Sequence, residues 1–178
     1  VDELIGFCNR NVYGGSLRPM TGTIESARAA GHALSDLPAL GYAHIRGYST
    51  RKNGSRRNVT EAKAVARFLE TWGDRLKEVY PKTSIGEIVA VVTPFRAQKE
   101  EIEAALDEIG FPHDDLTVGT VHSLQGAERP VVLFSPTYGS NDLSSSLFFD
   151  NSFNMLNVAI SRAKYHFVVI GDVRVFRN

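Results

Sequence analysis

The chain has 178 residues, of which 43% are hydrophobic and 22% charged, a composition that excludes disordered and fibrous proteins. Its 20 Lys and Arg residues balance 20 Asp and Glu residues, which excludes a general positive field as a basis for nucleic-acid binding and leaves open a local basic patch. A single cysteine excludes internal disulfides. The sequence has neither an apolar run of roughly 20 residues nor the pattern of a signal peptide, so we expect a cytoplasmic or otherwise intracellular protein with no membrane contact.

Residues 11–41 are a weakly patterned lead-in. Glycines and prolines recur through 11–41, which predicts loop with short helical pieces. Loose alternation over 42–48 predicts a strand, and 49–57 is a polar loop with four cations.

A long helix is predicted next. Asn58 has the character of an N-cap, and Glu61 completes a capping-box pattern. Apolar residues at helical spacing predict an amphipathic helix over 59–79, which Pro81 ends.

The second half of the chain alternates buried strands with helices. The apolar run 88–92 predicts a strand buried on both faces, and Thr93 and Pro94 predict the N-cap and first position of a helix that ends at Gly110. The remaining predicted elements are strands over 116–121, 131–134 and 167–170, a loop over 135–152 and a helix over 153–164. This pattern predicts an α/β fold with a mainly parallel sheet covered by helices on both faces.

Ligands of such sheets bind beyond the carboxyl ends of the strands. We therefore expect the functional groups to follow Val92 and Val121, with a contribution from the helix before the last strand.

Arg162 is an anomaly on the predicted helix 153–164. A helical projection places it within the apolar arc, whereas Asn157, Ser161 and Lys164 fall on the polar side. Two interpretations are open: the guanidinium stabilises the helix end and extends to the surface, or it enters a cleft and pairs with a phosphate.

Residues 118–130 follow a buried strand and carry several neutral hydrogen-bonding side chains together with Gly119 and Gly126. Neutral donors and close backbone approach suit phosphate positioning, and Glu128 suits a sugar hydroxyl or a metal-bound water. A polar connection with a glycine turn is the structural alternative.

Two further segments have both structural and functional interpretations. In 93–98, helix-start chemistry explains the first two residues, while Arg96 and Gln98 lie where a helix N-terminus could bind an anion. The loop 49–57 holds the only dense basic patch of the sequence, a candidate nucleic-acid contact formed by Arg51, Lys52, Arg56 and Arg57.

Some chemistry is missing from the sequence. There is no G-x-x-x-x-G-K-[ST] loop, no strand that ends in a metal-binding Asp-Glu pair and no catalytic triad, and the five histidines lack metal-ligand spacing. The chain therefore lacks the parts to hydrolyse ATP alone, and we expect no metal site formed by the chain itself.

Taken together, three segments resemble motifs IV, V and VI of superfamily 1 helicases: 93–98 (TPFRAQ), 119–128 (GTVHSLQGAE) and 157–164 (NVAISRAK). The branch typified by the nonsense-mediated-decay helicase is the most similar, since 58–62 (NVTEA) also matches it. Residues 4–18 are similar to the segment that follows the Tyr-Arg motif of that family.

The resemblance implies that residues 1–178 form the second RecA-like motor domain, a three-layer α/β/α unit in which 1–40 is an irregular lead-in from a first motor domain. ATP and Mg²⁺ would be bound mainly by that first domain. Arg162 would be the catalytic arginine finger, with Gln98, Gln125, Gly126 and Glu128 also facing the nucleotide, and Thr93, Thr120 and His122 facing the nucleic acid.

Two functional hypotheses follow. The first is the motor domain of an ATP-dependent helicase or translocase that acts on single-stranded DNA or RNA and is inactive in isolation. The alternative is a nucleic-acid-binding or scaffolding module with the same fold that hydrolyses nothing.

Overall fold

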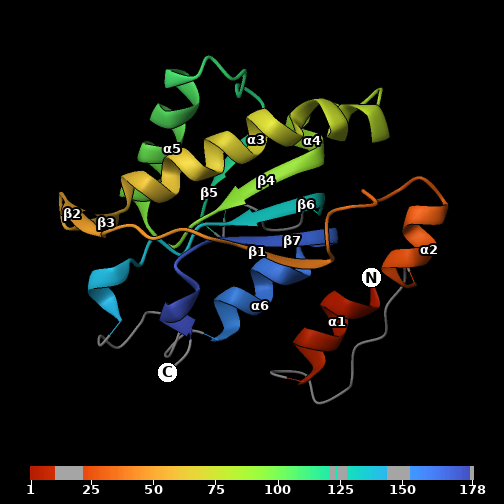
Figure 1. Ribbon diagram of the computed structural model, residues 1–178, viewed down its shortest axis with the longest axis horizontal. Coiled ribbons are helices and arrows are strands. Elements are labelled where there is room, and N and C mark those ends of the chain that lie inside the picture. Colours follow the sequence, from red (N-terminus) through yellow and green to blue (C-terminus); the bar gives the residue numbers. More distant parts are fainter. Residues whose placement is uncertain (11–21, 121–122, 124–127, 144–152, 177–178) are drawn as a thin grey trace.

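A five-stranded, all-parallel sheet forms the centre of the computed structural model, which describes residues 1–10, 22–120, 123, 128–143 and 153–176, with backbone alone for Phe7 and 153–155. The strand order is β1-β7-β6-β4-β5 (Figure 1). The bounds are Leu40–His44 for β1, Val89–Val92 for β4, Thr117–Gly119 for β5, Arg129–Phe134 for β6 and Ala163–Gly171 for β7.

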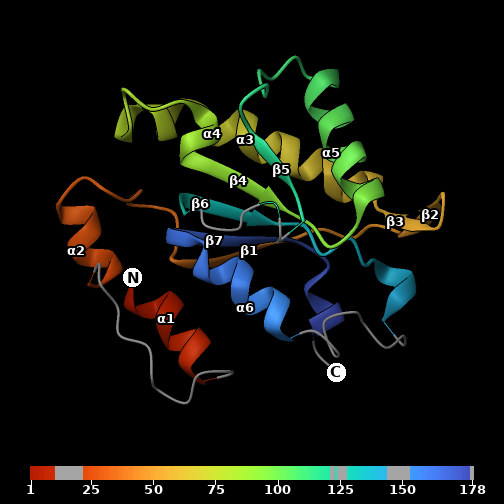
Figure 2. The same cartoon turned by 180° about the vertical axis from the view of Figure 1, so that it is seen from behind.

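Helices cover both faces of this sheet (Figures 1 and 2). One face packs against α3 (Val59–Val79), α4 (Ile85–Ile88) and α5 (Arg96–Glu108), and the other lies beneath α1 (Asp2–Cys8), α2 (Ile24–Ala29) and α6 (Phe153–Ser161). Along β4, Val89 and Val91 join the first core while Ala90 and Val92 join the second. The predicted three-layer α/β fold is therefore confirmed.

The polar loop predicted over 49–57 is a β-hairpin. Strands β2 (Thr50–Lys52) and β3 (Ser55–Arg57) pair antiparallel around Asn53 and Gly54. Both turn residues have positive φ angles, 51° and 78°, as a two-residue type I′ turn requires. The Asn-Gly dipeptide was the sequence signal for this turn.

Several predicted boundaries were wrong. Strand β1 ends at His44 because the chain leaves β7 there, so it does not reach Tyr48. Ile88 belongs to the short helix α4 and not to a strand. Ser84 and Glu87 form the sequence pattern of a capping box, which could have predicted this helix. In the structure the Ser84 N–H donates to a Glu87 carboxylate oxygen.

The helix after β4 begins later than predicted. Thr93 still belongs to the sheet region, because its N–H donates to the Gly119 carbonyl, and Pro94 favours an extended conformation for the residue before it. The N-cap of α5 is Phe95, and the first helical residue is Arg96. Gly110, with a φ of 66°, follows the helix end as predicted.

Helix α6 ends at Ser161, three residues before its predicted end, and β7 begins at Ala163, so Lys164 lies in a strand. Its faces also differ from the projection: Asn157 is 3% exposed and Val158 is 37% exposed. The buried side contacts α1, where the Cys8 Sγ lies 4.0 Å from the Asn157 carbonyl. None of the described helices is long and apolar enough to span a membrane.

Candidate functional site

The candidate residues lie at two opposite edges of the sheet. Thr93 and Thr120 follow β4 and β5 at the carboxyl edge, whereas Glu128 and Arg162 directly precede β6 and β7 at the amino edge. Glu128 was expected beyond a carboxyl end, and its place directly before β6 differs from that expectation. Arg162 was expected on the helix before the last strand, and it lies in the turn between that helix and β7.

Arg162 is half-buried in the turn between α6 and β7. Its Nε and Nη2 atoms lie 3.4 and 3.2 Å from the hydroxyl of Ser161, which is the neighbouring residue. Among the described residues no carboxylate forms an ion pair with its guanidinium. The positive charge is therefore held near the surface without a described anionic partner, which suits an anion supplied from outside the chain.

Backbone contacts bring Glu128 close to Arg162. The N–H of Arg129 donates to the Arg162 carbonyl at 2.9 Å, so the two segments meet at the starts of β6 and β7. Glu128 is exposed, and the amino group of Val1, at 3.1 Å from the Lys164 carbonyl, is also at this edge. The other predicted groups of this segment, His122, Gln125 and Gly126, lie outside the described residues.

Gln98 does not face the nucleotide edge. Its side chain is completely buried, with Oε1 accepting the Asn58 N–H at 2.6 Å. Its Nε2 donates to the Asn58 carbonyl at 3.2 Å and to the Ser135 hydroxyl at 3.0 Å. Because both amide hydrogens and the oxygen have internal partners, we correct the prediction: Gln98 joins the start of α3 to the end of β6.

Thr93 is also buried rather than presented to nucleic acid. Its hydroxyl lies 3.1 Å from the Thr137 hydroxyl, and the side chains of both residues are inaccessible to solvent. Thr137 adopts a φ of 74°, which is strained for a β-branched residue and must be held by its surroundings. Thr93 therefore stabilises the segment after β6, and direct contact with a strand is not supported.

Glu61 holds the same segment from α3. Its Oε1 accepts hydrogen bonds from the Ser135 hydroxyl and the Thr137 N–H, both at 2.6 Å. Its Oε2 is buried against Gly171 without a hydrogen-bond partner. Burial raises the pKa of Glu61 to about 8, and the nearby Asp172 charge acts in the same direction. The predicted N-cap is confirmed, because Asn58 Oδ1 accepts the Glu61 N–H at 3.2 Å, but the reciprocal bond of the capping box does not form, since the Asn58 N–H donates to Gln98.

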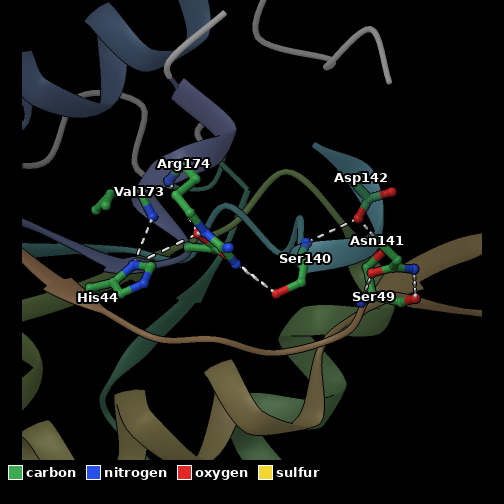
Figure 3. A network of polar contacts seen from close by, with 9 residues as sticks. His44, Ser49, Ser140, Asn141, Asp142, Val173 and Arg174 are labelled. Atoms are coloured by element: carbon green, nitrogen blue, oxygen red, sulfur yellow. Dashed lines mark hydrogen bonds and ion pairs between the residues drawn. The ribbon is translucent and has the colours of Figure 1, made fainter. Parts of the chain in front are cut away.

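A second polar network closes the carboxyl ends of β1 and β7 (Figure 3). Arg174 binds both carboxylate oxygens of the buried Asp172, at 2.9 and 2.6 Å, which lowers the pKa of Asp172 to about 2. Ser140 donates to the same carboxylate at 3.1 Å. His44 accepts the Val173 N–H through Nδ1, which lies 3.7 Å from Asp172. These contacts fasten the chain after β7 to the turn at 140–142.

The four cations of the predicted basic patch differ in their contacts. Arg56 bonds to Asp142 and Arg57 to Glu101, and the two arginines are only partly exposed. Lys52 lies 3.6 Å from Glu100 with both side chains over 40% exposed, a pairing of little energetic weight. Arg51 is exposed, and within the described ranges its side chain has no ion pair or hydrogen bond.

Sequence reasoning missed the buried acids at the carboxyl edge: Glu61, Asp142 and Asp172. Glu61 was assigned to a helix cap, and the other two lie in segments with no periodic pattern. The sequence signal near Asp142 is Gly139. The structure explains why this position is a glycine, because an added Cβ there would lie 2.4 Å from the Gly47 carbonyl oxygen. Among the described residues, no group of three or more potential ligands could hold a metal ion.

The all-parallel sheet covered by helices on both faces defines a three-layer α/β/α domain, and within the described residues Arg162 has no carboxylate partner at its amino edge. Comparison with known proteins gives the family: residues 1–174 match the AAA domain family AAA_12, and the chain belongs to it. With its relatives, it is a superfamily 1 helicase domain of the Upf1-like branch.

Three relatives illustrate this assignment. The human probable helicase senataxin is 30% identical over 128 residues, which cover 72% of the chain and 5% of that protein. The zebrafish putative helicase mov-10-B.2 is 28% identical over 192 residues, with coverage of 96% and 18%. The ATP-dependent helicase upf1 of Schizosaccharomyces pombe is 28% identical over 179 residues, with coverage of 95% and 18%. The chain thus spans less than a fifth of each of these relatives.

Proposed function

We propose that the chain is the second motor domain of an ATP-dependent helicase or translocase that acts inside the cell on single-stranded DNA or RNA. The observation that carries this proposal is the environment of Arg162. The side chain is half-buried, has no carboxylate partner among the described residues and lies near Glu128 at the amino edge of the sheet. From this edge the guanidinium could contact a ligand of a neighbouring domain. The likeness to relatives named helicases supports it.

The amino edge would meet ATP held by the first motor domain. Arg162 would neutralise negative charge on the terminal phosphate, a role worth about 10³ to 10⁵ in rate in comparable enzymes. Glu128, with Gln125 and Gly126, would approach the nucleotide at the ribose or at a water of Mg²⁺. The residues present fit this role, because the Arg162 guanidinium has no ion pair within the described residues and Glu128 is exposed beside it.

The carboxyl edge would hold the strand. Thr120 is partly exposed at the end of β5, and we assign it and His122 to the strand, together with the exposed Arg51 and Lys52 of the hairpin. Phosphate contacts of this kind serve any base sequence.

Coupling between the edges would use the segment 120–128. It leaves the carboxyl end of β5 and returns at the amino end of β6, so one stretch of chain joins the strand contact to the nucleotide contact. When the gap between the domains closes on ATP, movement of Glu128 would shift Thr120, and opening after hydrolysis would reverse that shift.

Steady-state ATPase measurements test the assignment. The protein with both motor domains should hydrolyse ATP slowly alone and faster with single-stranded DNA or RNA. A protein that binds single strands and shows no hydrolysis under either condition would instead be the non-hydrolysing binding module.

A further inference from the structure

Arg56 is held by three groups of its own chain. Its Nη1 lies 2.6 Å from an Asp142 carboxylate oxygen and 2.8 Å from the Ser49 hydroxyl. Its guanidinium also lies 4.9 Å from the ring centroid of Tyr138, a cation–π contact. The Asp142 side chain is only 5% exposed, so this ion pair is shielded from solvent far more than the other pairs of the hairpin.

Asp142 also organises the base of the hairpin (Figure 3). Its Oδ2 accepts from the Ser49 hydroxyl at 2.5 Å and from the Gly139 N–H at 3.0 Å. Next to it, Asn141 accepts the Ser49 N–H and donates to the Ser49 carbonyl, both at 2.9 Å. Ser49, the residue before β2, is thus hydrogen-bonded to the turn at 140–142 through its side chain, its N–H and its carbonyl.

Near its turn the hairpin contacts α5, since the Ser55 hydroxyl accepts the Ala97 N–H at 3.2 Å and Lys52 lies 3.6 Å from Glu100. Arg57 reaches Glu101 from the base of the hairpin, where it pairs with Thr50. Arg51 is exposed and lies directly opposite Arg56 in the register of the two strands, so its position depends on how firmly Arg56 is held.

We propose that Arg56 and Asp142 are a positioning pair that sets the hairpin so that Arg51 contacts the phosphates of the bound strand. The inference rests on the proposed function, and it replaces the predicted direct contact of Arg56 with nucleic acid. Arg51 is the contact residue, and Arg56 acts through it.

Asp142→Asn separates this proposal from direct binding by Arg56. If Arg56 itself bound phosphate, removal of the opposing carboxylate would release its charge and strengthen binding. If the pair positions the hairpin, the same change loosens the base and weakens binding. The two models therefore predict opposite signs for one nearly isosteric substitution.

The experiment measures affinity for a fluorescent single-stranded oligonucleotide across a salt series, in the protein with both motor domains. We expect Arg51→Ala to reduce the slope of log affinity against log salt by about 0.7, the value for one phosphate contact of a single strand. Asp142→Asn should weaken binding about 3- to 10-fold at low salt, reduce the slope similarly and leave ATPase without nucleic acid unchanged.

The double variant Arg51→Ala/Asp142→Asn should bind no more weakly than Arg51→Ala, because the positioned contact is already absent. Arg56→Gln in the Arg51→Ala background should likewise add no loss, and it provides the same test if Asp142→Asn does not fold. Asp36→Asn is the matched control, because Asp36 also forms an ion pair with an arginine that contacts an aromatic ring. The Arg75 Nη1 lies 2.6 Å from the Asp36 carboxylate, and its guanidinium lies 5.1 Å from the centroid of the Trp72 ring, near the other end of α3. It should leave strand affinity unchanged.

Tighter or unchanged binding by Asp142→Asn, or an additive loss from Arg56→Gln in the Arg51→Ala background, would overturn the proposal. A wild-type protein that binds no single strand would contradict the proposed function itself, which is a distinguishable result.

Discussion

The substitution Glu61→Gln tests the buried acid that holds the segment after β6. Glutamine resembles the protonated carboxyl in shape, and its Oε1 can accept the same hydrogen bonds from the Ser135 hydroxyl and the Thr137 N–H. The substitution therefore keeps the hydrogen bonds and removes only the possibility of a buried negative charge.

The pH dependence follows from the raised pKa. Between the ordinary value of 4.5 and about 8, folded Glu61 retains a proton that the unfolded chain has released. The folded state binds more protons in this range, so the free energy of unfolding contributed by Glu61 falls as pH rises from 4.5 to 8. At about 1.4 kcal/mol per pH unit, the loss over this range is at most about 5 kcal/mol.

Urea denaturation at a series of pH values from 5 to 8 measures this effect. We expect Glu61→Gln to be progressively more stable relative to the wild type as pH rises, by a few kcal/mol at pH 8. Glu70→Gln removes one charge from an exposed position of the same helix and serves as the control. A difference between Glu61→Gln and wild type that does not change with pH would refute the assignment of a buried, proton-retaining carboxyl.

Two further stability predictions concern the carboxyl edge. Gln98→Ala leaves the buried Asn58 N–H without its acceptor and should cost about 2 to 4 kcal/mol in urea denaturation; a loss under 1 kcal/mol would show that Gln98 does not join α3 to β6. Gly139→Ala places a Cβ 2.4 Å from the Gly47 carbonyl oxygen and 2.8 Å from the Ser49 nitrogen, and it should cost about 1 to 3 kcal/mol. Gly6→Ala lies inside α1, where among the described residues a Cβ would meet the end of Arg10 at 3.5 Å, and it should be neutral or stabilising by up to about 1 kcal/mol. Equal losses at the two glycines would contradict this reasoning.

The sequence predicted the layers well because burial leaves a local trace. The apolar run of β4 and the helical spacing of α3 each identify an element without reference to the rest of the chain. The resemblance to superfamily 1 helicases of the Upf1-like branch was confirmed by the family match over residues 1–174 together with the helicase relatives.

Placement of the candidate site was less predictable because it depends on tertiary contacts. Nothing local distinguishes Gln98 inside the fold from a glutamine at a helix N-terminus that faces a ligand; its partner Asn58 lies 40 residues away. Similarly, Arg56 became a positioning candidate only through Asp142, 86 residues distant. The edge to which Arg162 belongs depends on where α6 ends and β7 begins.

The central claim is that Arg162 acts on ATP from outside the domain that binds it, and Arg162→Ala in the protein with both motor domains is its most direct test. We predict a fall in the strand-stimulated kcat for ATP hydrolysis of at least about 10³-fold, with single-strand affinity retained. Wild-type turnover by this variant would contradict the account.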